Sequence, residues 1–316
     1  MACVYCHSQA GLLPGPGGRS ISSAQENSEE LVMARITLPL ALVLLVGLLV
    51  LPAFAAQPVD FRVESSVFLI KEKSILSTPG KPKPEELISR STTIFNRGVI
   101  YDFLDHPAEI IIFDPANQRF ILLDVDRKLR TELTTTIVGK AIDRLKGLAK
   151  SAKTDRTRFL LDPKFDESVD TETGALVFDS EWLTYRVTGT PAGNPAVVQQ
   201  YRDFSDWAAK LNAFLRPNSQ PPFARLILDE ALAKRGEVPS KIELTLKTRH
   251  GLTTHKEQLR AEYHLVKRLV ESDRRRIAQA GKQMAAFKQV GFRQYEARLN
   301  AEEKKPAEVP AKPKSQ

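Results

Sequence analysis

The sequence predicts an α+β fold, in which a curved antiparallel β-sheet of the half-barrel type has helices packed on its concave face and a long C-terminal helix follows. Three observations predict it. Short runs rich in β-branched and aromatic residues follow one another between residues 60 and 134. Amphipathic helical patterns alternate with later strand-like runs, and residues 270–299 carry an apolar stripe at helical spacing.

Residues 33–56 are predicted to direct export. Residues 33–56 have the layout of a secretory signal peptide, with a basic start at Arg35, an uncharged apolar run Ile36–Leu51, and small residues Ala53 and Ala55 at an Ala-x-Ala cleavage pattern. A permanent membrane anchor is the alternative, although this run is shorter than the roughly 20 residues that span a bilayer. We therefore expect export to the periplasm or cell surface.

Residues 1–32 look like a disordered leader or a start codon assigned too far upstream. They contain the haem-attachment pattern Cys3-x-x-Cys6-His7, which precedes the export signal, so we expect no haem and no other cofactor in the exported protein. Without residues 1–56 the charged residues number 46 − 2 = 44 basic and 38 − 3 = 35 acidic, a net charge of +9. Outside the cytoplasm this charge favours anionic lipid or wall polymer over nucleic acid as a partner.

The first half of the exported chain reads as a β-meander. Residues 60–134 contain the runs "DFRVESSVFLI", "STTIFNRGVIYDFL", "AEIIIFD", "QRFILLDV" and "KLRTEL". Their close spacing requires antiparallel neighbours. Ile110–Phe113 and Phe120–Leu123 are apolar on both faces, so the middle of the sheet is expected to be covered on both sides. Residues 71–89 are expected to form a polar, proline-rich loop.

The second half mixes helices and strands. Thr136–Lys150 predicts a helix whose apolar face is formed by Ile137, Ala141, Leu145 and Leu148. Three further strand-like runs follow: "TRFLLDPKFDES", "ALVFDSEWLTYRVTG" and "AVVQQYRDF".

The remaining elements are two helices, a strand pair and a terminal helix. Helices are predicted over Asp203–Leu215 and from Pro221 to Gly236, strands over residues 241–250 and 254–266, and the last helix over residues 270–299. Residues 301–316 are rich in Lys, Pro and Ala, so we expect a disordered tail.

No catalytic motif is found. The sequence has neither a Gly-x-Ser-x-Gly elbow nor a thiol after Cys6, and no glycine-rich phosphate loop, so we do not expect an enzyme. His250 and His255 flank a predicted turn near Glu257, which leaves open a two-histidine metal site, but exposed turn histidines are the simpler interpretation and no metal is assigned.

Two sets of residues are candidates for binding. Aromatic side chains that could line an apolar cavity, or equally fill a core, are Phe61, Tyr101, Phe103, Phe120, Trp182 and Tyr185. The basic run Arg274, Arg275 and Arg276 of the last helix is the candidate contact for an anionic surface, with a helix packed on the sheet and its charges in solvent as the alternative.

The run "GVIYDFLDHPAEIIIFDPANQRFILLDVDRKLRTEL", within a meander interrupted by helices, resembles the LolA/LolB family of lipoprotein carriers. The resemblance covers residues 60–265 and is architectural. It implies one domain over residues 57–300, in which an incomplete barrel wraps over helices and acyl chains lie between them. This chain enters a strand directly at Asp60 and adds a basic C-terminal helix, so the resemblance implies a relative with its own ligand.

Two functions follow as expectations. The first is a noncatalytic binding protein that holds an acyl or other apolar ligand between sheet and helices, where each buried methylene contributes about 0.8 kcal/mol. The alternative is a structural or scaffolding protein of the cell envelope that binds anionic membrane, wall polymer or a protein partner through the basic C-terminal helix.

Overall fold

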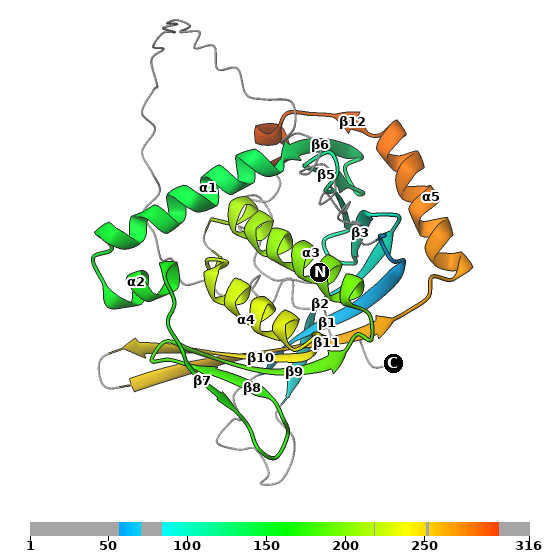
Figure 1. The fold of residues 1–316 in the computed structure, drawn as a ribbon. Helices are drawn as coiled ribbons and strands as arrows, with labels where there is room; N and C mark the ends of the chain where they lie inside the picture. The colour runs from blue at the N-terminus through cyan, green and yellow to red at the C-terminus, as the bar shows by residue number, and fades with distance from the viewer. Residues whose placement is uncertain (1–56, 71–83, 218, 251–252, 297–316) are drawn as a thin grey trace, which may run out of the picture. The chain divides into compact units, whose positions relative to one another are not determined.

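The structure, a computed structural model, describes residues 57–70, 84–217, 219–250 and 253–296. They form an α+β body around an open, curved, twelve-stranded sheet in the order β12-β6-β5-β4-β3-β2-β1-β11-β10-β9-β8-β7 (Figure 1). The strands are β1 (Phe61–Ile70), β2 (Glu85–Asn96), β3 (Val99–Leu104), β4 (Glu109–Asp114), β5 (Arg119–Asp124), β6 (Leu129–Thr134), β7 (Asp166–Val169), β8 (Leu176–Asp179), β9 (Leu183–Pro191), β10 (Glu237–His250), β11 (Thr253–Val266) and β12 (Lys288–Gln289).

The predicted meander is confirmed. Each of β1 to β5 pairs antiparallel with the next strand along the chain, as the short connections from β2 to β6 require. The tight turn between β4 and β5 sets Phe113 opposite Phe120 and places Gln118 at φ 50°, in the left-handed region. β1 also pairs with β11, which joins the meander to the strands of the second half.

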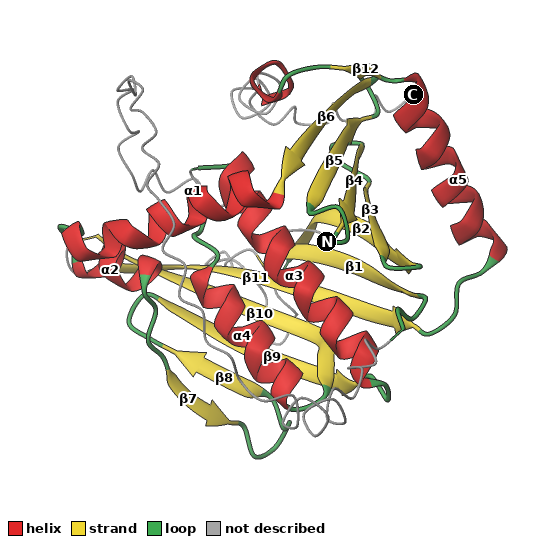
Figure 2. Ribbon diagram, turned by 45° about the horizontal axis from the view of Figure 1, so that its top comes forward, coloured by secondary structure: helices red, strands yellow, loops and turns green. Residues whose placement is uncertain are grey.

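The helices are α1 (Thr135–Gly147), α2 (Asp155–Leu161), α3 (Pro195–Leu215), α4 (Phe223–Lys234) and α5 (Glu271–Ala286), with the short 3-10 helix η1 (Leu148–Ser151) after α1. The sheet curves around α3 and α4, whereas α5 lies on its other side (Figures 1 and 2). We call the face toward α3 and α4 the inner face and the face toward α5 the outer face.

The middle of the sheet is covered on both sides, as predicted from its apolar runs. In β5, Phe120 and Leu122 belong to the inner cluster with residues of α3 and α4, while Ile121 and Leu123 belong to the outer cluster with Ala280 of α5. Alternation of neighbouring residues between the two faces accounts for this division. The helical layers therefore bury both apolar faces of β4 and β5.

Two runs predicted as strands are helical. The run at 157–168 begins within α2, whose N-cap Thr154 accepts a hydrogen bond from the backbone N–H of Thr157, and only its end enters β7. The run at 196–204 is the first part of α3, which begins at Pro195 after the N-cap Asn194 rather than at Asp203. Asn followed by Pro is a helix-start signal, and it prevails over the β-branched residues that follow it.

The predicted apolar face of α1 is right for Ala141 and Leu145, which are half-buried, and wrong for Ile137 and Leu148. The buried residues of α1 are Thr135, Val138 and Ile142. Ile137 and Leu148, predicted to be buried, are 50% and 49% exposed. The helix has apolar residues on two sides, and packing on α3 selects the side of Val138.

The long C-terminal helix is not confirmed. The structure contains the shorter α5, after which Lys288 and Gln289 form β12, parallel to β6. A new helical segment starts at residue 292. The chain leaves the helix at Phe287 because the backbone N–H groups of Lys288 and Val290 bond instead to carbonyls of the strand edge, at 3.0 and 2.9 Å.

Hydrogen bonds from an arginine and a tyrosine side chain to buried carboxylates attach this C-terminal segment to the sheet. The Arg62 side chain donates to both carboxylate oxygens of Asp273, at 3.1 and 2.8 Å. Tyr295 Oη donates to Glu109 Oε1 at 2.5 Å, with both side chains buried. These bonds hold both ends of the segment, and Ala280 fixes its middle against the isoleucines of the outer cluster.

The segments predicted as leader (1–32), signal peptide (33–56) and disordered tail (301–316), and most of the predicted proline-rich loop (71–83), lie outside the described residues. β2 begins at Glu85, inside the segment predicted as loop. Among the described helices, none combines the length and apolar character needed to cross a bilayer.

Candidate functional site

The helices α3 and α4 form one insert between the paired strands β9 and β10, and we call residues 195–234 the helical hairpin. Gly193 (φ 75°) precedes it and Gly236 (φ 70°) follows it, both in the left-handed conformation that glycine adopts without strain. The backbone N–H of Ala192 donates to the Gly236 carbonyl at 3.3 Å, so the two ends of the hairpin meet at one place on the sheet. The hairpin therefore joins the sheet through adjacent glycines.

A buried ion pair lies inside the hairpin. Arg225 Nε donates to both carboxylate oxygens of Asp229, at 2.9 Å each, on successive turns of α4. Ser205 of α3 donates to Asp229 Oδ2 at 2.6 Å and accepts from Arg225 Nη2 at 3.1 Å. Burial alone lowers the pKa of Arg225, but the Asp229 carboxylate together with Tyr263 and Tyr201 outweighs burial and keeps that pKa well above its ordinary value. The guanidinium thus stays charged and is neutralised within the hairpin.

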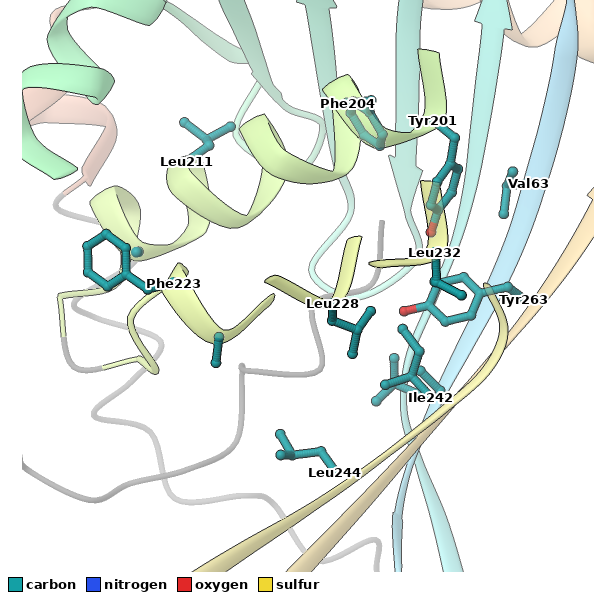
Figure 3. Close-up of a cluster of buried hydrophobic side chains, with 14 of the residues drawn as sticks. Val63, Tyr201, Phe204, Leu211, Phe223, Leu228, Leu232, Ile242, Leu244 and Tyr263 are labelled. Carbon is teal, nitrogen blue, oxygen red and sulfur yellow. The ribbon is translucent and has the colours of Figure 1, made fainter. Parts of the chain in front are cut away.

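Two tyrosines bring the sheet and the hairpin together at this ion pair. Tyr263 of β11 receives a long contact of 3.5 Å from Arg225 Nη1. Figure 3 shows the hydroxyls of Tyr201 and Tyr263 directed into the same region beside Leu228 and Leu232. Among the described residues no group forms a hydrogen bond of normal geometry with the Tyr201 hydroxyl, and burial raises the pKa of Tyr201 well above its ordinary value. The Tyr201 phenol therefore stays neutral in the interior.

Asp206 is a second carboxylate near the ion pair. Burial, with repulsion from the Asp229 carboxylate, raises the pKa of Asp206 to about 6. Arg202 Nε lies 3.9 Å from Asp206 Oδ2, and Asp206 Oδ1 has no hydrogen-bond partner among the described residues. Asp206 consequently changes its charge between mildly acidic and neutral pH.

The inner face of the sheet contributes further polar groups. Thr93 Oγ1 donates to Asp102 Oδ1 at 2.7 Å, and the hydroxyls of Ser65 and Ser91 are 2.9 Å apart. All four side chains are 3% exposed or less. Ser65 lies two residues from each of the inner-face residues Val63 and Val67. Residues two apart on a strand point to the same face, so this polar group lies on the side of the hairpin. The interior is thus apolar with a polar centre.

Three of the predicted lining residues lie on the inner face. Phe61 stacks on Phe95 with ring centroids 4.0 Å apart, and Phe120 stacks on Phe113 at 4.7 Å. Tyr185 is 1% exposed in the same cluster. The aromatic rings of β2, β4 and β5 meet Phe204 and Trp207 of α3, so these contacts lie between sheet and hairpin.

The other predicted lining residues are not part of that group. Tyr101 and Phe103 belong to the outer cluster beneath α5, because they alternate along β3 with the inward-facing Ile100 and Asp102. Trp182 packs on Phe159 of α2, with ring centroids 4.9 Å apart, at the margin of the inner cluster. The structure therefore divides the predicted set between two faces.

The predicted anionic contact is also divided. Arg274 and Arg275 are exposed on α5. The Arg276 guanidinium lies over the Phe103 ring, 4.5 Å from its centroid. Arg276 thus contributes to the attachment of α5 to the sheet.

The histidines of the β10–β11 strand pair do not oppose one another. The register places His255 opposite Thr248 and His250 opposite Thr253. Within the described residues no group of three metal-ligating side chains is found.

The sequence analysis missed the ion pair. Arg225 and Asp229 are four residues apart on a predicted helix whose other residues are mostly apolar, and that spacing was the available signal. The partner Ser205 comes from a different helix, so the complete group is visible only in the folded chain.

Comparison with known proteins identifies no family. No family model matches the chain, and no curated protein matches its sequence. Among solved structures, a porin-like protein from Bacteroides uniformis ATCC 8492 is similar with 7% identity, 65% of this chain and 96% of that chain covered, and a TM-score of 0.21. A similarity this low carries no argument about fold or function.

Proposed function

We propose that this chain is an exported, noncatalytic binding protein that holds an acyl or lipid-like ligand between its curved sheet and its helical hairpin. The proposal includes a half-barrel architecture related to that of the LolA/LolB carriers, with the hairpin on the concave face. One observation carries it: the hairpin covers an apolar sheet face while its own buried charge is neutralised internally.

This arrangement favours a removable cover. A buried cation paired across the interface would be left unpaired when hairpin and sheet separate, at a cost of several kcal/mol. Here Asp229 and Ser205 move with Arg225, and the described contact from Arg225 to the sheet is the 3.5 Å approach to Tyr263. When the helical hairpin moves away from the sheet at its glycine ends, apolar surface is exposed. An acyl chain that covers this surface is stabilised by about 0.8 kcal/mol for each methylene that it buries.

The polar centre of the interior suits an amphiphile. An acyl chain lies against apolar side chains, whereas its head group needs hydrogen-bond partners when it is buried. Tyr201, Tyr263 and the Thr93–Asp102 pair supply donors and acceptors there. We therefore propose a ligand with one polar end, such as a fatty acid or a lipidated peptide.

The two tryptophans allow a direct test. Trp207 on α3 contacts the Phe113 and Phe120 rings at centroid distances of 6.3 and 6.1 Å, and Trp182 lies outside that interface. The Trp182→Phe variant leaves Trp207 as the only tryptophan, and the matched Trp207→Phe variant leaves Trp182. Brominated stearate quenches indole fluorescence only at short range.

We expect brominated stearate to quench Trp207 with saturation near one ligand per chain, to quench Trp182 less, and unlabelled stearate to displace it. Equal quenching of both tryptophans without saturation would indicate nonspecific adsorption and would contradict the proposal. Absence of quenching would also contradict it.

The exposed cations of α5 support the scaffolding alternative. Arg274 and Arg275 are free to meet an anionic surface while Asp273 and Ala280 hold the helix on the sheet. Salt-sensitive sedimentation with wall polymer that is lost on Arg274→Glu and Arg275→Glu would favour this function over ligand binding.

A further inference from the structure

The outward side of α1 and η1 carries both apolar and basic side chains. Ile137 and Leu148 are 50% and 49% exposed, and Lys140 and Arg144 lie exposed between them. The spacings of three, four and four residues put all four on one stripe of the helix. At about 1.5 Å per residue the stripe is roughly 16 Å long. We call these four residues the α1 stripe.

This pattern differs from ordinary surface exposure. Single exposed apolar residues are normal in folded proteins. The other large apolar side chains found exposed are Leu87, Val169 and Val270, each on a different segment. Only α1 and the adjoining η1 place two on one line with cations between them, within the described part of the chain.

The charge around the stripe has one sign. Residues 136–153 contain five basic side chains and one acidic side chain, Asp143, a net charge of 5 − 1 = +4. In the described part of the chain no ion pair involves Lys140, Arg144 or Lys150. These cations are therefore available to a partner that is anionic.

We propose that the α1 stripe docks on a bilayer surface that carries anionic phospholipid head groups. Ile137 and Leu148 enter the boundary between head groups and acyl chains, while Lys140 and Arg144 meet the phosphates, as in other interfacial amphipathic helices. The opposite side of α1 remains fixed on the body, since Val138 and Ile142 are buried there. Docking thus needs no rearrangement of α1.

The position of α1 relates this surface to the helical hairpin. α1 packs against α3, and Figures 1 and 2 both draw it alongside the α3–α4 pair. A bilayer bound to the stripe lies next to the element that covers the inner face. The inference goes beyond the proposed ligand binding and does not require it, since it concerns only the outer side of α1.

Cosedimentation with vesicles tests the docking surface. The protein is mixed, without detergent, with phosphatidylcholine vesicles and with vesicles that also contain phosphatidylglycerol. The test variant is K140E/R144E, and the matched control is K267E/R268E, which reverses two exposed charges in the connection after β11 instead. I137S/L148S removes the apolar side chains and leaves the charge unchanged.

We expect binding to the anionic vesicles only, and weaker binding when salt rises from about 0.1 to about 1 M. K140E/R144E should lower the partition coefficient at least tenfold and I137S/L148S about fivefold, whereas K267E/R268E should change it less than twofold. All side chains changed are exposed, so the urea midpoint of each variant should match that of the wild type.

Several results would overturn the inference. They are equal binding to neutral and anionic vesicles, no binding to either, and loss of binding in K267E/R268E but not in K140E/R144E. A change of oligomeric mass in light scattering caused by the α1 variants, without vesicle binding by the wild type, would assign the stripe to contact between copies of the chain. Quenching of Trp207 fluorescence by brominated stearate reports on the interior alone. Failure of the ligand-binding proposal is therefore distinguishable from failure of the docking proposal.

Discussion

The ion pair inside the helical hairpin makes a quantitative prediction. The Asp229→Leu variant removes the carboxylate that accepts two bonds of 2.9 Å from Arg225, whose side chain is buried. An uncompensated buried guanidinium remains. Breaking a buried pair in this way costs about 3–5 kcal/mol, and Arg225→Met should cost a similar amount because it strands Asp229.

The double variant Arg225→Met/Asp229→Leu should behave differently. It replaces both charges by apolar side chains of similar size, and such replacements are near neutral or stabilising. Ser205 loses both partners, which costs about 1–3 kcal/mol if its hydroxyl stays unsatisfied. We therefore expect the double variant to be more stable than either single variant by roughly 2 kcal/mol or more, with strong coupling between the sites.

Urea unfolding followed by circular dichroism measures these differences as changes in midpoint at constant slope. A single variant that loses less than about 1 kcal/mol would refute the reasoning, because it would mean that water or another group replaces the missing partner. Additive effects of the two single changes would equally refute it.

Three further variants test other parts of the structure. Asp206 has a pKa of about 6 in the folded chain against an ordinary 3.8. Because the carboxyl of the unfolded chain ionises first, Asp206 opposes folding increasingly as pH rises from about 4 to 6. The Asp206→Asn variant should therefore flatten the fall in urea-derived stability over that window and be about 2–3 kcal/mol more stable than the wild type at pH 7 to 8. Tyr295→Phe removes the bond to buried Glu109 and should lower the urea-derived stability by about 1–3 kcal/mol, whereas no loss would mean that Glu109 finds another donor. Ala280→Leu overfills the outer cluster and should cost about 1–3 kcal/mol in the same assay, and the control Ala285→Leu, at an exposed position of α5, should cost less than about 0.5.

Local patterns predicted the meander because each of its elements carries its own signal. Strands β2 to β6 are separated by short turns, so sequence neighbours are also spatial neighbours. The double covering of the sheet followed from Ile110–Phe113 and Phe120–Leu123 for the same reason, since a strand that is apolar on both faces needs two layers.

Predictions failed where a distant partner decides the outcome. Ile137 and Val138 offer α1 two apolar sides, and only the contact with α3 determines which is buried. The last helix ends at Ala286 because the edge of β6 supplies backbone partners for Lys288 and Val290, a pairing that no local signal encodes.

The candidate site was predicted less completely than the fold. Aromatic composition led to Phe61, Phe120 and Tyr185 on the inner face, but composition does not record which face a residue occupies, and Tyr101 and Phe103 of the same predicted set lie in the outer cluster. The register of β3 with its neighbouring strands determines which of its side chains point to the inner face. The ion pair depends on the meeting of α3 with α4, which is a tertiary contact.

The central claim is that the interior between sheet and hairpin holds an acyl chain, and mass spectrometry of bound lipid tests it most directly. The protein is purified without detergent from the periplasm of an expressing host, extracted with organic solvent, and the acyl species are counted against an equal amount of an unrelated periplasmic protein. We predict close to one acyl-bearing molecule per chain, retained through washing. Acyl content no greater than that of the unrelated protein would contradict the account.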